Sequence, residues 1–104
     1  MELRRVVVTG LGAITPLGNN VSDYWNNLLN GVSGAAPITR FDASKFKTQF
    51  ACEVKGFNPE DFLDRKEARK LDPFSQDGLC SVIQAVKDAG LDGENAFDPD
   101  RAGV

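Results

Sequence analysis

Apolar residues recur at helical spacing in the segment 21–29. Positions i, i+3, i+4, i+7 and i+8 there are filled by Val21, Tyr24, Trp25, Leu28 and Leu29. This spacing predicts one apolar stripe on an amphipathic helix. Asn20 or Ser22 is suited to cap its start, and Gly31 to end it. We expect the Tyr24–Trp25 pair with Leu28 to lie in the core rather than in a site.

A second helical pattern runs from about Pro73 to Ala89. Asp72 and Pro73 form a cap-plus-proline start signal, and Gly90 stands where a glycine commonly ends a helix. The predicted helix carries an apolar stripe made of Leu79, Val82, Ile83 and Val86.

The apolar run Val6–Val8 lacks the alternation of a half-exposed strand, which predicts a strand buried on both faces. Gly10 and Gly12 follow it and suit a close backbone approach or a positive φ. A dinucleotide-binding βα module is an alternative interpretation of Gly10-x-Gly12. The third glycine of that fingerprint is missing because residue 15 is Thr, so a tight exit from the strand is preferred.

The middle of the chain, residues 32–58, has little periodicity. A short strand is predicted at 50–54, a short helix over 58–63, and the start of another strand at 102–104. One clear strand cannot satisfy its own hydrogen-bonding edges. We therefore expect the chain to be an incomplete part of a larger protein.

Composition narrows the possible chemistry. The 104 residues carry a formal net charge of -3 and no histidine, which argues against nucleic acid as a partner and excludes histidine-based acid–base catalysis within the chain. No run of about 18 apolar residues exists, so no membrane span is expected. No metal-ligand spacing is present either, and neither a metal nor a cofactor is predicted.

The two cysteines, Cys52 and Cys80, are expected to be free thiols of a cytoplasmic protein. Cys80 lies on the predicted long helix between Leu79 and Val82, and both cysteines are interpreted as small packed residues rather than nucleophiles. No catalytic residue is predicted in this chain.

The run VVVTGLGAITPLGN at residues 6–19 resembles the opening of the β-ketoacyl-acyl-carrier-protein synthases, most closely the type II ketosynthases of bacterial fatty acid synthesis. The resemblance continues collinearly through Trp25, Leu28–Leu29, Arg40–Asp42 and the segment 65–72. It covers essentially the whole chain, and polyketide ketosynthases share much of the same opening.

The resemblance implies an α/β chain that forms part of a thiolase-like, five-layered αβαβα fold, usually a homodimer. Residues 1–104 would be the amino-terminal portion of the first thiolase-like half, with no complete second domain. The implied reaction is decarboxylative condensation of malonyl-acyl carrier protein with an acyl-acyl carrier protein in fatty acid elongation. The family's reactive cysteine and two histidines map beyond Val104, so the isolated chain is expected to be inactive.

The segment 64–71 is strongly basic. Lys66, Arg69 and Lys70 are spaced to share one face of a helix. The resemblance maps the family's carrier-docking cations onto these three residues, and an acidic carrier protein is the expected partner. The alternatives are a solvated face paired with Glu67, a non-catalytic carrier-binding module, and a polyketide ketosynthase segment.

Overall fold

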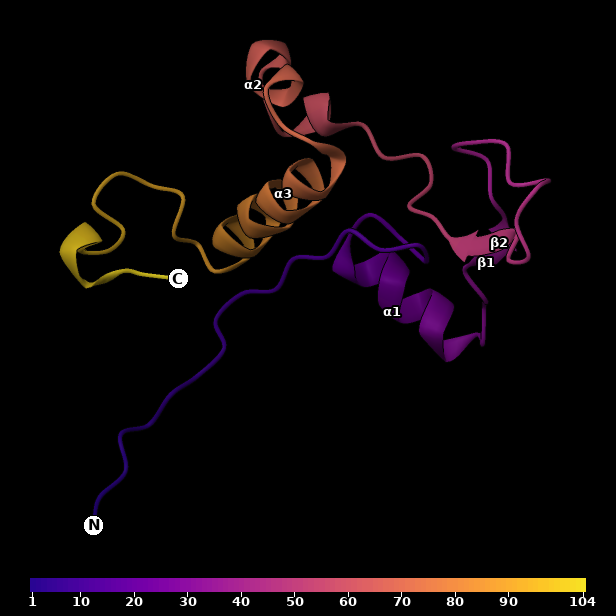
Figure 1. Ribbon diagram of the computed structural model, residues 1–104. Coiled ribbons are helices and arrows are strands. Elements are labelled where there is room, and N and C mark those ends of the chain that lie inside the picture. The colour runs from indigo at the N-terminus through magenta and orange to yellow at the C-terminus, as the bar shows by residue number, and fades with distance from the viewer.

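The computed structural model describes residues 1–104 and centres on the helix α3, Pro73–Asp88, with the other segments arranged around it (Figure 1). The radius of gyration is 17.4 Å, whereas a compact chain of this length has about 13 Å. Only three residues are buried: Ala43, Ala68 and Cys80. The chain therefore presents its apolar faces largely uncovered.

Helix α3 confirms the second helical pattern. Asp72 occupies the N-cap position, Pro73 is the first helical residue, and Gly90 follows the C-cap with φ +72°. The apolar stripe is only partly covered, since Leu79 is 41% and Val82 56% exposed. No helix in the chain combines the length and apolar character needed to cross a bilayer.

Helix α1, Val21–Leu29, confirms the first pattern. Of the two candidate caps, Asn20 is the one used: its side-chain oxygen accepts a hydrogen bond from the Asp23 amide at 2.8 Å. Gly31 follows the helix with φ +65°. The expected core position of the aromatic stripe is wrong, because Trp25 is 57% exposed and no other helix or strand packs over it.

The predicted buried strand at Val6–Val8 is also wrong. The segment belongs to no sheet, and its valines are largely exposed; Val6 is 90% exposed. A strand needs neighbours for its backbone N–H and C=O groups, and the chain places no second strand beside this one. It extends away from the other segments as the indigo tail of Figure 1.

From Leu11 onward the same segment runs along α3, whose side chains bind its backbone. The Leu11 amide donates to Asp88 Oδ2 at 2.9 Å, and the Ala13 amide donates to Gln84 Oε1 at 3.1 Å. Gln84 Nε2 in turn donates to the carbonyl oxygen of Asn19 at 2.7 Å. Two helix side chains thus replace part of the missing sheet pairing.

The two glycines of Gly10-x-Gly12 allow this close contact. A Cβ at Gly10 would overlap the carbonyl oxygen of Ala85, and one at Gly12 would overlap that of Ser81. Alternate residues of an extended segment advance about 6.6 Å and residues four apart in a helix about 6 Å, so the two registers match. The predicted close approach is confirmed, and neither glycine has a positive φ.

A two-stranded antiparallel ribbon lies at one end of the molecule (Figure 1). Strand β1, Ala35–Pro37, pairs with β2, Phe50–Cys52, with Ala36 opposite Ala51. The predicted strand at 50–54 is confirmed over its first three residues. Strand β1 was not predicted, because Ala-Ala-Pro has low β propensity.

Short helical turns complete the chain. They are η1 (Pro59–Asp61), α2 (Arg65–Arg69) and η2 (Pro99–Arg101). Turn η1 confirms the predicted short helix, with Asn58 accepting a hydrogen bond from the Glu60 amide. The strand expected at 102–104 is absent from the sheet pairing.

Candidate functional site

Helix α2 presents the basic residues, and its inner side is fixed to α3. Ala68, the middle of the inner side, is only 3% exposed. The side chain of Gln76, on the first turns of α3, donates through Nε2 to the Ala68 carbonyl oxygen at 2.8 Å. This bond satisfies one of the carbonyls left free at the end of a helix. The opposite side of α2 therefore faces solvent.

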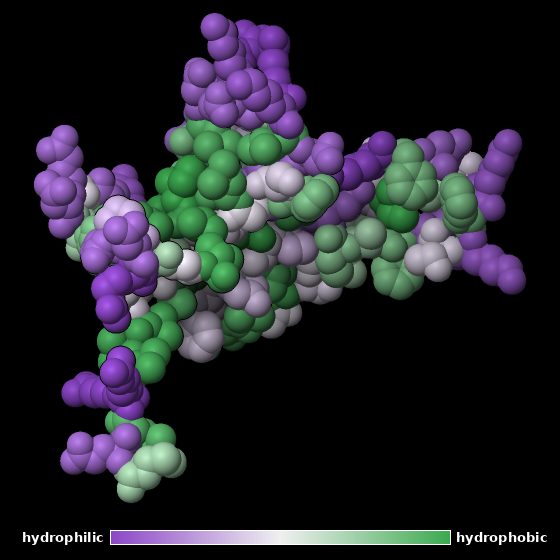
Figure 2. All heavy atoms as spheres, turned by 60° about the vertical axis from the view of Figure 1, so that its left-hand side comes forward, coloured by the Kyte–Doolittle hydropathy of each residue, from purple (hydrophilic) through white to green (hydrophobic).

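The structure brings Lys66, Arg69 and Lys70 together on that outer side, and all three are exposed. Lys70 occupies the C-cap position in a right-handed helical conformation, so it continues the face of Arg65–Arg69. In Figure 2 the hydrophilic atoms at the top of the molecule cover the region in which α2 lies in Figure 1. The predicted common face is confirmed, while its docking role stays a prediction.

The cations of α2 differ in their partners. Lys70 Nζ lies 3.1 Å from Glu67 Oε1, and Arg65 Nε lies 3.8 Å from Glu60 Oε1. Lys66 and Arg69 take part in no ion pair. The alternative of intrahelical pairing with Glu67 thus holds for one of the three predicted docking residues.

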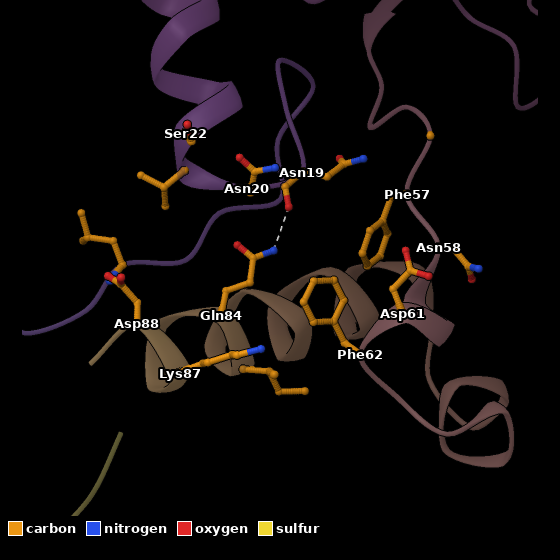
Figure 3. A pocket seen from close by; sticks show the side chains of 14 residues that line it. Asn19, Asn20, Ser22, Phe57, Asn58, Asp61, Phe62, Gln84, Lys87 and Asp88 are labelled. Atoms are coloured by element: carbon orange, nitrogen blue, oxygen red, sulfur yellow. Dashed lines mark hydrogen bonds between the residues drawn. The ribbon is translucent and has the colours of Figure 1, made fainter. Parts of the chain in front are cut away.

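A groove of about 1020 Å³ lies between α3, the start of α1 and the segment before η1. Phe57 and Phe62 line one side, and Gln84 and Lys87 project from α3 on the other (Figure 3). Asn19 borders the groove through its bond to Gln84. Sequence reasoning missed this network, although the spacing of Gln84 and Asp88 four apart beside an apolar stripe was a usable signal.

Neither the groove nor the rest of the chain offers a reactive nucleophile. Cys80 is fully buried, and burial, with a smaller contribution from the charge of Asp77, raises the pKa of its thiol above 9.0. A buried neutral thiol is a poor nucleophile, which confirms its interpretation as a packed residue. Cys52 is exposed on β2, so its expected packed position is wrong: the ribbon has no layer covering that face. Both thiols are free, as predicted.

Gly10-x-Gly12 does not form a nucleotide site. The pair faces the backbone of α3 with no space for a pyrophosphate, and α1 begins only at Val21. In the dinucleotide fingerprint the glycines lead directly into a helix that receives the phosphate. The preference against a dinucleotide module is supported, although the segment before the glycines is not a strand of any sheet.

Both a family model and individual relatives show that this chain is similar to β-ketoacyl synthases. A family model described as the β-ketoacyl synthase N-terminal domain matches residues 3–104. A 3-oxoacyl-[acyl-carrier-protein] synthase 2 of Coxiella burnetii is 55% identical over 104 residues, and one of Synechocystis sp. is 51% identical over the same length. Each alignment covers 100% of this chain and 25% of the relative, so the chain spans about a quarter of their length.

Solved structures of the same kind share the fold. The ishigamide ketosynthase/chain length factor superposes with a TM-score of 0.82 at 39% identity, over 90% of this chain and 23% of that one. A β-ketoacyl synthase from Burkholderia phymatum gives 0.71 at 26% identity, over 89% and 23%. The open arrangement of helices around α3 is thus a fragment of the ketosynthase fold. With its family model matched from residue 3 to residue 104, this chain belongs to the β-ketoacyl synthase family as an amino-terminal segment.

Proposed function

We propose that this chain is the amino-terminal portion of the first thiolase-like half of a longer 3-oxoacyl-[acyl-carrier-protein] synthase. That enzyme condenses malonyl-acyl carrier protein, with loss of CO2, with an acyl-acyl carrier protein in fatty acid elongation. The names of the relatives at 51% and 55% identity support this reaction over a polyketide role. The chain itself supplies scaffold and part of the carrier-docking surface.

The docking proposal rests mainly on two cations of α2 that form no ion pair with an acidic side chain. Lys66 and Arg69 are exposed and free of acidic partners, while Ala68 and Gln76 hold the helix from behind. A positive surface on a fixed helix attracts an acidic protein, orients it and raises its association rate. Lys70 completes the surface at the end of the helix.

The scaffold proposal rests on the uncovered apolar residues. Helix α3 exposes Leu79 and Val82, and the amino-terminal segment exposes Val6 and Val8. Large apolar residues left exposed in this number mark faces that pack against more protein. The rest of the ketosynthase chain, and a second copy in a homodimer, are the proposed covering partners.

Catalysis is assigned to the rest of the enzyme. Condensation needs a reactive thiolate, an oxyanion hole and groups that stabilise a developing enolate. The chain contains no histidine, and the thiol of Cys80 is buried with a raised pKa. Residues 1–104 on their own are therefore proposed to be inactive.

The docking proposal is tested by charge reversal in the full-length enzyme. Lys66→Glu with Arg69→Glu should lower the association rate constant for holo-acyl carrier protein by about tenfold or more at low ionic strength, and by less at high salt. Lys45→Glu with Lys47→Glu is the matched control, because both lysines are exposed, lie in the segment that joins β1 to β2 rather than on α2, and change the net charge equally when reversed. Equal association rate constants for holo-acyl carrier protein in the two double variants would contradict the proposal.

A further inference from the structure

The basic helix contains its own competing acid. Between residues 65 and 70 the chain carries Arg65, Lys66, Arg69 and Lys70, and a single acid, Glu67. Lys70 Nζ donates to Glu67 Oε1 at 3.1 Å, a distance at which the hydrogen bond and the ion pair coincide. The partner of Lys70 is therefore part of the same short helix.

The positions on the helix show what Glu67 affects. At 3.6 residues per turn, Arg69, Lys66 and Lys70 fall in that order within an arc of about 100°, so Lys66 lies between the other two. Glu67 lies about 60° beyond Lys70, at the border of this arc. Its carboxylate thus pairs with Lys70, the cation at that edge of the surface, and leaves Lys66 and Arg69 free.

We infer, on the basis of the proposed docking function, that Glu67 is a specificity-determining residue of the α2 surface. An incoming acidic partner must displace the Glu67 carboxylate before it can bind Lys70. A partner with one isolated acid gains nothing from exchanging one carboxylate for another. A partner with several clustered acids first binds Lys66 and Arg69 and is then placed to compete for Lys70. The surface therefore favours densely acidic proteins over weakly acidic ones.

The pair is accessible enough for such an exchange. The side chains of Lys70 and Glu67 are 69% and 61% exposed, and exposed pairs of this kind are weak. The exchange is consequently fast and small in free energy. Glu67 therefore changes which acidic partners the α2 surface prefers and does not prevent their binding.

The test measures the dissociation constant of the full-length enzyme for holo-acyl carrier protein at low ionic strength. Glu67→Gln should tighten binding by about twofold, the size expected when an exposed ion pair is released. The charge-matched control is Asp64→Asn, one residue before α2. Asp64 takes part in no ion pair and its side chain makes no capping bond, so this change should have a smaller effect.

A double-variant cycle separates release of Lys70 from a general change in charge. In a Lys70→Gln background, Glu67→Gln should lose its advantage, because no cation remains to be released. An effect of Glu67→Gln equal to that of Asp64→Asn, or one that persists without Lys70, overturns the inference. The docking proposal itself stands or falls separately, on whether reversal of Lys66 and Arg69 weakens binding.

Discussion

Gly12 packs against the backbone of Ser81 on α3 so closely that only a hydrogen atom fits between them. A Cβ at Gly12 would overlap the Ser81 carbonyl oxygen and lie 2.8 Å from the Ala85 nitrogen. Both neighbouring groups are helical backbone, which cannot move aside as a flexible side chain can. This contact fixes the distance between the amino-terminal segment and the central helix.

We expect Gly12→Ala to destabilise the protein by about 1–3 kcal/mol, the usual cost of overpacking. Urea unfolding measures the change. Gly78→Ala is the matched control, since a Cβ at Gly78 meets nothing within 4 Å. This second variant should stabilise α3 by about 0.5–1 kcal/mol. The same stability change in both variants would contradict the packing argument.

Gln84 should matter for stability because it bonds two backbone groups at once. Replacing it with alanine leaves the Ala13 amide and the Asn19 carbonyl oxygen without their partners, at an expected cost of about 1–3 kcal/mol. Gln84→Glu keeps an acceptor for Ala13 and places a carboxylate against the Asn19 carbonyl, so it should also destabilise. Unfolding midpoints as high as that of the unchanged protein would refute the bridging role.

The two thiols should differ in reactivity. Cys80 is fully buried and burial raises the pKa of its thiol, so iodoacetamide at neutral pH should leave it unmodified in the folded protein. Urea should abolish this protection. Mass spectrometry of the labelled peptides distinguishes Cys80 from the exposed Cys52. Rapid modification of Cys80 without denaturant would contradict its place in the core.

Acid should loosen the loop next to the ribbon. Glu53 accepts hydrogen bonds from the hydroxyl and amide of Thr39 and from the amide of Arg40. The Thr39 hydroxyl is the main cause that lowers the pKa of Glu53 below its usual 4.5. A lowered pKa in the folded state means that these contacts contribute stability above about pH 4.5, which is lost as the pH falls through the folded value.

Hydrogen exchange of the Thr39 and Arg40 amides, corrected for the intrinsic pH dependence, measures this loss. Protection should fall between pH 5 and pH 3, on the order of the titration range of a carboxylate. Glu53→Gln should reduce protection at neutral pH and remove its pH dependence. Unaltered protection in that variant would show that the loop is held by other contacts.

The common face of Lys66, Arg69 and Lys70 follows from helical spacing and was predictable from the sequence. Its orientation was not. Ala68 gives no sign in the sequence that it is buried, and the bond from Gln76 to its carbonyl joins residues eight apart across a helix break. The groove beside α3 escaped prediction for the same reason, since its lining comes from three separate segments.

The sequence by itself determined the two longest helices and their ends. Asn20 and Gly31 bound α1, and Asp72 and Gly90 flank α3, as predicted. This is possible because helical hydrogen bonds join residues four apart, so the information is local. The tertiary structure decided whether Val6–Val8 forms a buried strand and how far the apolar stripes are exposed. Strand pairing and burial need partners from other parts of the structure. A local apolar pattern indicates that such a partner is needed but does not provide it.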